Sequence, residues 1–363
     1  MKDFITVIPS IRNVKNVDNL NCEIIVVDDS NGKIKSTRKN MRVYDYRKQK
    51  EFFKRLFKGK WKEYYDMIPH KTDTCRSFGF LVALHEGWKK VVTIDDDVIL
   101  PPDFLKKHNV IGKYAETRPL LSLGWGWYNP IDMLKMKPDD IVYARGYPRW
   151  ERDGRDFFYG LPKRRGRVIL NCGLWTNIPD IDAMDKITET STSKGFKNKL
   201  LKRVSLEMGA FAPLSIMNLS FLSEAVPAFY QVPMKYNFGN GETIDRFGDV
   251  FSSYIIEHLV GIKRDVISIG EPLVKHMKEG NLLQEIKNEM WGHIISPIFY
   301  DMVNNSMKGV EKSDYAIMYE QFVNNFLNEV NRMKTKLVFI QNYFKFIVRN
   351  MERWCEACQT IIR

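Results

Sequence analysis

Three consecutive aspartates, Asp95, Asp96 and Asp97, follow an apolar, β-branched run at residues 91–94. A buried strand that ends in clustered carboxylates can hold a divalent cation against a diphosphate, because Mg²⁺ and Mn²⁺ prefer oxygen ligands and often share phosphate oxygens. Alternate residues of an extended segment point to the same side, so Asp95 and Asp97 are the predicted ligands and Asp96 faces the other way. An acidic turn is the simpler alternative, because aspartate suits turns at strand ends.

The segments that must position this cluster alternate between strand and helix patterns. The expected strands are residues 4–9, 22–27, 41–46 and 91–94, with a helix over about 72–89 before the last of them. Alternating strands and helices predict a parallel α/β sheet, whose ligands bind beyond the carboxyl ends of its strands. Asp28 also follows such an end, where we expect it either to help fix a nucleotide or to serve an ordinary turn.

Composition narrows the class of protein. The net charge of +12 favours anionic partners, and a nucleotide diphosphate or an acidic membrane surface explains it equally well. Nothing in the sequence resembles a recognition helix or an aromatic RNA-binding motif, as nucleic-acid binding would require. Five scattered cysteines without a secretion signal indicate reduced thiols and a cytoplasmic protein. The sequence has no run of about 18 uncharged apolar residues, so a transmembrane helix is not expected.

The rest of the chain divides into an irregular middle and a helical end. Residues 124–185 are rich in Gly, Pro, Trp and charge, and we interpret them as an irregular active-site wall. Residues 282–363 form a helical extension with apolar steps of three and four, which predicts packing and a homo-oligomer; peripheral membrane contact is not favoured. The predicted domains are therefore 1–281, which is catalytic, and 282–363.

Eight short motifs occur in order over about residues 5–281 and together resemble the reversibly glycosylated polypeptide, or UDP-arabinopyranose mutase, family. They are IPSIRN (8–13), VVDD (26–29), CRSFG (75–79), TIDDD (93–97), RGYP (145–148), GLWTNIPDIDA (173–183), MNLSF (217–221) and RFGD (246–249).

The resemblance implies a GT-A-like, Rossmann-related fold with a mostly parallel central sheet flanked by helices. It also implies a divalent cation, Mn²⁺ or Mg²⁺, and a UDP-sugar whose pyranose and furanose forms are interconverted while an arginine is reversibly glycosylated. By position Arg152 inherits that role, with Asp153 and Asp182 as catalytic carboxylates and His276 beside Asp95 and Asp97 on the cation. The residues expected around the nucleotide are Pro9, Arg12, Asp28, Arg76, Asp96, Arg145, Asn218, Asp249 and Lys278.

Several alternatives stay open. A guanidinium is protonated at ordinary pH, so Arg152 is either a diphosphate clamp or, if a carboxylate withdraws a proton, a nucleophile. Arg76 and Arg145 are either phosphate contacts or structural ion pairs, and His276 is either a ligand or a surface histidine. A glycosyltransferase with a separate acceptor and a non-catalytic nucleotide-sugar-binding subunit are the rival functions. One of the family's paired acids is missing at Gly248-Asp249.

Overall fold

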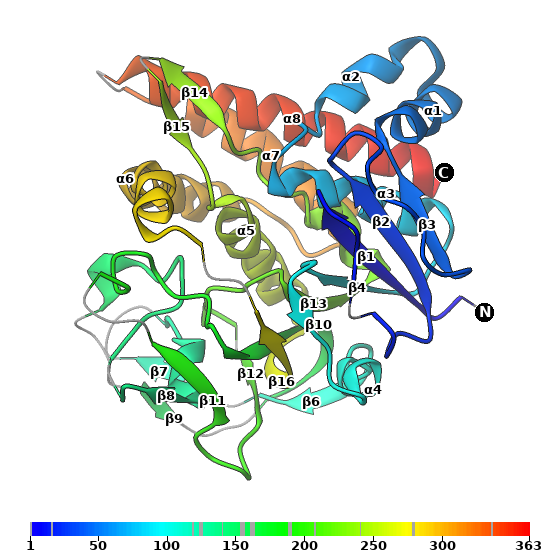
Figure 1. The fold of residues 1–363 in the computed structure, drawn as a ribbon. Helices are drawn as coiled ribbons and strands as arrows, with labels where there is room; N and C mark the ends of the chain where they lie inside the picture. The colour runs from blue at the N-terminus through cyan, green and yellow to red at the C-terminus, as the bar shows by residue number, and fades with distance from the viewer. Residues whose placement is uncertain are drawn as a thin grey trace.

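The computed structural model describes residues 2–15, 17–117, 120–122, 126–139, 141–152, 157–159, 164–187, 191–206, 208–239, 241–277, 280–334 and 337–363, with the backbone alone at 120–122 and 157–159. Its centre is a twelve-stranded sheet (Figure 1). Strands β1 (Phe4–Ser10), β2 (Glu23–Asp28), β3 (Met41–Tyr44) and β4 (Lys90–Ile94) are parallel and lie in the order β4-β1-β2-β3.

The second half of the sheet mixes directions. Strand β13 (Asn218–Leu222) runs antiparallel between β4 and β10 (Arg165–Asn177), which lies parallel to β16 (Val266–His276); β12 (Arg203–Leu206) closes the edge. The predicted α/β class is confirmed, and the arrangement is compatible with a GT-A-like fold. The shorter strands are β5 (Val98–Ile99), β6 (Tyr114–Glu116), β7 (Leu120–Ser122), β8 (Leu134–Lys137), β9 (Phe157–Tyr159), β11 (Thr192–Phe196), β14 (Tyr236–Gly239) and β15 (Glu242–Ile244).

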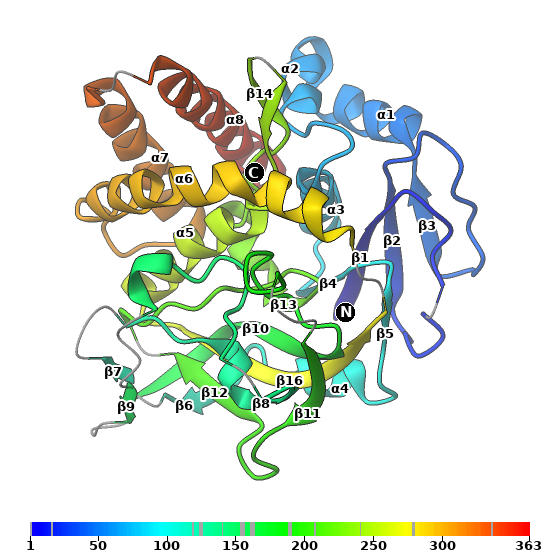
Figure 2. The ribbon, with the colours of Figure 1, turned by 60° about the vertical axis from the view of Figure 1, so that its left-hand side comes forward.

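Helices cover the sheet and continue to the end of the chain. They are α1 (Tyr46–Phe57), α2 (Trp61–Asp66), α3 (Arg76–His85), α4 (Phe104–His108), α5 (Gly248–Lys263), α6 (Leu282–Met307), α7 (Tyr315–Arg332) and α8 (Val338–Ile362). Figure 2 shows α6 crossing the molecule in front of α5, on the side where β10 and β16 lie together. None of the described helices is both long enough and apolar enough to cross a membrane.

The expectation of an irregular segment over 124–185 is wrong for Arg165–Asn177, which form the thirteen-residue strand β10. Its residues from Val168 to Trp175 are all buried, because the strand has neighbours on both sides and layers on both faces. A strand buried on both faces reads as a continuous apolar run, so it lacks the alternation by which strands are usually found. Arg165 and Arg167 belong to the same strand, and Arg167 pairs with Glu224 and Asp265.

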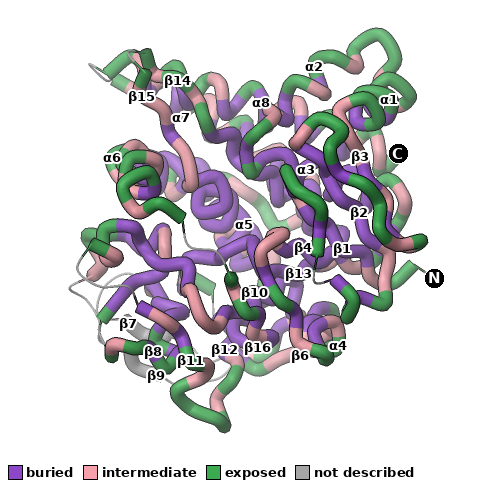
Figure 3. Tube along the Cα trace, in the orientation of Figure 1, coloured by how far each residue is buried: buried purple, intermediate pink, exposed green. Residues whose placement is uncertain are grey.

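The helical extension shares the core of the sheet. Ile340, Phe344, Met351 and Trp354 of α8 belong to the same buried cluster as strands β1, β2 and β4, and the Trp354 indole donates to the Pro227 carbonyl at 2.9 Å. Figure 3 shows α8 and α5 buried along the sides that face the body. Much of the apolar seam that predicts an oligomer is thus covered within this chain, and both the homo-oligomer and the domain division stay predictions.

A buried histidine at the end of α4, His108, joins strands β10 and β13. The side chain of Asn171 donates to His108 Nδ1 at 3.0 Å, Ser220 Oγ lies 2.8 Å from the same nitrogen, and Nε2 lies 2.9 Å from Asn218 Oδ1. This set fits a neutral imidazole that donates from Nε2 and accepts at Nδ1. Burial lowers the pKa of His108 to about 3.

We therefore expect acid to destabilise the fold through His108. Between pH 6.5, the ordinary pKa of histidine, and about pH 3, this imidazole is protonated in the unfolded chain and neutral in the folded chain. The free energy of unfolding therefore has its full value above pH 6.5. It decreases by about 1.4 kcal/mol per pH unit as the pH drops through this window. Chemical denaturation at a series of pH values measures the slope, which should decrease in His108→Gln. Ser220→Ala is the control, since it removes one partner but keeps the imidazole, and it should retain the slope; equal slopes in His108→Gln and the native chain would contradict the assignment.

Candidate active site at the carboxyl ends of the strands

Two of the three predicted metal ligands are brought together by strand pairing. The triple aspartate leaves β4 and turns directly into β5, which pairs antiparallel with the end of β16 so that Val98 lies opposite His276. The Met277 amide donates to the Asp97 carbonyl at 3.1 Å, which extends the pairing by one step. As a result His276 Nε2 lies 3.7 Å from Asp97 Oδ1.

The chemistry of this pair fits a divalent cation. His276 Nδ1 is 2.9 Å from the Ile178 carbonyl, which can only accept, so Nδ1 carries a proton and Nε2 is the nitrogen that faces Asp97. Asp97 Oδ1 is buried and has no hydrogen-bond partner among the described residues. Nε2 and Oδ1 are both atoms that can bind a cation, and burial together with the Asp95 carboxylate raises the pKa of Asp97. A cation between them would satisfy both, because metal-bound histidines commonly donate their other nitrogen to a carbonyl.

The other two aspartates are engaged by arginines. Arg76 is buried, and its guanidinium donates to Asp95 Oδ1 at 2.5 Å and to Thr93 Oγ1 at 2.6 Å. Asp95 is thus paired with a buried arginine, while its charge still acts on Asp97. Arg12 bridges Asp96 and Asp97, at 3.1 Å from Asp97 Oδ2, and Asp96 also accepts from Ser10. With 42% of its side chain exposed, Arg12 is the accessible cation at this strand end.

The remaining nucleotide candidates at the strand ends are less accessible. Asp28 is buried and accepts from Ser30 and from the amides of Gly32 and Ile34, so it organises its own turn. Asn218 is also buried, where it holds His108 and donates to the carbonyls of Leu174 and Pro272. Pro9 lies on β1 beside Val27 of β2.

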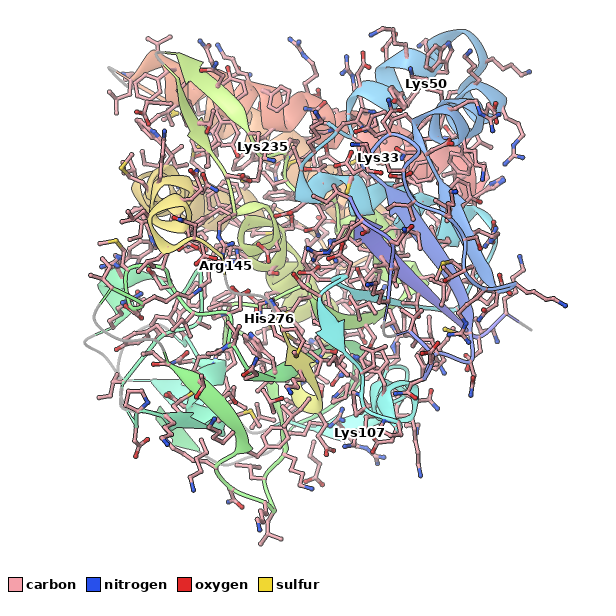
Figure 4. The ribbon with its side chains drawn as sticks, viewed as in Figure 1. Lys33, Lys50, Lys107, Arg145, Lys235 and His276 are labelled. Carbon is pink, nitrogen blue, oxygen red and sulfur yellow. The ribbon has the colours of Figure 1, made fainter. Side chains whose placement is uncertain are left out.

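Arg145 forms a double ion pair in the interior. Its guanidinium donates two bonds to Asp180 at 2.9 Å and two to Asp249 at 2.7–2.8 Å, and it also bonds the Arg246 carbonyl. Although burial lowers the pKa of Arg145, the two carboxylates raise it well above its usual value, and Arg145 in turn lowers that of Asp180. Arg145 and His276 both lie in the middle of the molecule in Figure 4. Of the two roles that the sequence left open for Arg145, a phosphate contact or a structural ion pair, the structure shows the ion pair.

Arg152 lies at the end of a short 3₁₀ turn, Arg149–Glu151, and its side chain is held by two carboxylates. Nη2 donates to Asp182 Oδ2 at 2.8 Å and Nη1 to Asp185 Oδ1 at 2.7 Å, while the guanidinium lies 4.3 Å from the centre of the Tyr143 ring. Only 15% of the side chain is exposed, and Nε is buried without a partner among the described residues. Predicted residues Arg152 and Asp182 are therefore in direct contact.

Helix α6 contributes two residues that sequence reasoning missed. Glu289 accepts from Arg246 Nε at 2.8 Å and from the Ala183 amide at 3.0 Å, and His293 Nε2 lies 3.4 Å from Asp182 Oδ2. Among the described residues, Asp182, Glu289 and His293 are the group whose possible metal-ligand atoms gather within 4.8 Å. Glu289 and His293 are four residues apart and therefore lie on one face of the helix. This spacing is the only feature of the sequence that could have pointed to the two residues. The other predicted catalytic carboxylate, Asp153, and the predicted nucleotide contact Lys278 lie outside the described residues.

The fold and this cluster define an α/β protein whose charged site lies beyond the carboxyl ends of its strands and is completed by a C-terminal helix. Residues 136–362 match the model of the family described as "Reversibly glycosylated polypeptide". The chain belongs to this family.

The chain is also similar to curated plant proteins. It is 27% identical over 302 residues to "Probable UDP-arabinopyranose mutase 1" of Pisum sativum, which covers 81% of this chain and 73% of that protein. It is 26% identical over 297 residues to "UDP-arabinopyranose mutase 2" of Arabidopsis thaliana, with 80% and 73% covered. It is 27% identical over 302 residues to "UDP-arabinopyranose mutase 1" of Oryza sativa subsp. japonica, with 80% and 72% covered.

Proposed function

We propose that this chain is a UDP-sugar mutase that interconverts the pyranose and furanose forms of a UDP-pentose, with Arg152 carrying the sugar between them. The observation that carries the proposal is the contact of the Arg152 guanidinium with the buried carboxylate of Asp182. The Ile178 carbonyl accepts from His276, and Asp182 lies four residues further along the chain. Four residues span at most about 14 Å, so the Arg152–Asp182 contact lies near the Asp97–His276 pair. The names of the plant relatives support a UDP-arabinose-like substrate.

Such a mutase must release UDP, open the sugar ring and close it through another hydroxyl before UDP returns. The diphosphate gains negative charge as it leaves, and Arg12 lies where it could meet that charge. A divalent cation held by Asp97 and His276 would stabilise the same leaving group. Arg76, Arg145, Asp249 and Asn218 are proposed to hold the strand ends in place. Arg76, Asp249 and Asn218 are buried, the Arg145 side chain is only 9% exposed, and each is bound to its neighbours.

The detached sugar needs protection from water, and a covalent bond to Arg152 would provide it. The two bonded carboxylates orient the guanidinium, and its stacking on Tyr143 restricts the plane in which it lies. A protonated guanidinium has no lone pair to give, so the bond can form only if a base removes a proton from it. Asp182 is the carboxylate in contact with Nη2, the nitrogen proposed to take the sugar.

The test is to incubate the purified full chain with UDP-arabinopyranose and Mn²⁺ in the absence of any acceptor. We expect UDP-arabinofuranose to appear by chromatography, and one pentosyl unit to be added to the intact mass of the protein. Consumption of the donor only after a sugar acceptor is added would favour the transferase. UDP binding without turnover or adduct would favour the non-catalytic subunit.

A further inference from the structure

His293 on α6 has an unusual position for a histidine without an assigned role. Its Nε2 atom lies 3.4 Å from Asp182 Oδ2 and 4.0 Å from Glu289 Oε2, and the ring packs edge-on against Phe247 at 5.1 Å between ring centres. Nε2 is buried and has no hydrogen-bond partner within the described part of the chain. The nitrogen therefore lies beside the oxygen of Asp182 that Arg152 also contacts.

A metal ion does not account for this grouping. Both oxygens of Asp182 are bound, Oδ1 by the Met184 amide at 2.8 Å and Oδ2 by Arg152, and both oxygens of Glu289 are bound, by Arg246 and the Ala183 amide. The positive charge that a cation would bring is already supplied by arginines. What these contacts leave available is the lone pair or proton on His293 Nε2.

Transfer of a sugar to arginine releases a proton that Asp182 is poorly suited to keep. Burial alone would raise the pKa of Asp182, but a protonated His293, together with Arg152, lowers it to about 2. Asp182 therefore does not keep the proton once His293 holds one. An imidazole is a stronger base than a carboxylate, and histidine commonly acts in this way.

We propose that His293 accepts, through Asp182, the proton that Arg152 loses when it takes the sugar from the UDP-sugar. The proposal rests on the proposed function and names a further residue of the same site. His293 acts through Asp182 and is therefore a positioning and proton-accepting residue that does not touch the sugar. This arrangement also explains why α6, from the C-terminal region, packs against the segment that holds Arg152.

The step balances in atoms and charge. The Nη2–H bond of Arg152 breaks as the bond from Nη2 to the sugar anomeric carbon forms, and the carbon–oxygen bond to the diphosphate breaks with its electron pair leaving on UDP. The proton moves to Asp182 Oδ2, and from there to His293 Nε2. The glycosylated guanidinium keeps its positive charge, UDP gains one negative charge and His293 gains one positive charge. Reversal returns the proton when UDP takes back the sugar.

The scheme requires a neutral His293 at the start, so adduct formation should slow at acidic pH, where the imidazole is already protonated. The surrounding charges come from every element packed around it. They are Arg149, Arg152, Asp182, Asp185, Lys186, Arg246, Glu285 and Glu289.

The decisive experiment follows the intact-mass adduct after rapid mixing of the full chain with UDP-arabinopyranose and Mn²⁺. His293→Gln keeps a group that can donate to Asp182 but cannot take the proton. We expect its adduct to form about 100-fold more slowly, with the acid limb of the rate–pH profile removed and UDP affinity unchanged. In His293→Ala, added imidazole should restore the rate. His85→Gln, at the end of α3 against Phe52, is the matched control and should behave like the native chain.

The failures are distinguishable. A native chain that forms no adduct overturns the proposed role of Arg152 and this inference with it. A native adduct together with native rates and the same acid limb in His293→Gln overturns only the inference. If His293→Gln does not fold, a native rate of adduct formation that is constant from about pH 5 to about pH 8 overturns it as well.

Discussion

Replacing Arg152 by alanine is expected to abolish the sugar adduct and to slow the mutase by about 10⁴-fold or more, as loss of a nucleophile does in other covalent enzymes. The guanidinium is the proposed carrier of the sugar, and alanine has no group that can form the bond. Arg152→Lys should also fail, because an ammonium cannot reach Asp182 and Asp185 through two separate nitrogens as the guanidinium does. Intact mass and furanose formation measure the two effects separately.

Arg165→Ala is the matched control for this experiment. Arg165 is an exposed arginine at the start of β10, where it lies over the Tyr114 ring. This variant should form the adduct and isomerise the substrate at native rates. UDP affinity should survive in Arg152→Ala, which shows that the fold is intact. An adduct of native yield in Arg152→Ala would assign the sugar to another residue and refute the role of Arg152.

Replacing Asp97 by asparagine should lower the mutase rate by about 100-fold or more and remove its dependence on Mn²⁺, since a bound cation contributes several kcal/mol to leaving-group stabilisation. The asparagine amide lacks the charge that faces His276, so the pair can no longer attract a cation. For the native chain, chelation should remove activity and Mn²⁺ should restore it. Titration with Mn²⁺, followed by the electron spin resonance of the free ion, measures binding directly.

The surface residue Asp103 provides the comparison. Asp103 pairs with Lys107 one helical turn away, and its side chain is 46% exposed. Asp103→Asn should bind Mn²⁺ and turn over like the native chain. If Asp97→Asn keeps both the affinity for Mn²⁺ and the metal dependence of the rate, the cation lies elsewhere and the Asp97–His276 pair is structural.

The proposed chemistry depends on a helix that composition assigned to packing. Helix α6 supplies Glu289, which anchors Arg246, and His293, which meets Asp182. The C-terminal region is thus part of the candidate site as well as of the core. Its contribution was hidden because one glutamate and one histidine four residues apart are common on any solvated helix face.

The sequence by itself predicted the elements whose patterns are local. The first strands, the helix before the triple aspartate and the α/β class all rest on short apolar runs and on turn residues between them. Four family motifs, at residues 8–13, 26–29, 93–97 and 173–183, cross strand ends. Asp182 lies in the last of them and Arg152 follows the motif at 145–148, so both could be named in advance. Strand β10 was missed, because full burial on both faces erases the alternation that marks a strand.

The tertiary structure alone decided which charged groups meet. Whether Arg145 contacts a phosphate or an ion-pair partner depends on Asp249, which lies 104 residues further along the chain. The approach of His276 to Asp97 depends on the pairing of β5 with β16, and that of His293 to Asp182 on the packing of α6. The type of a side chain determines which interactions an aspartate or an arginine can make. Its partners follow from long-range packing, because Coulomb and hydrogen-bond interactions act over a few ångströms in space, whatever the separation in sequence.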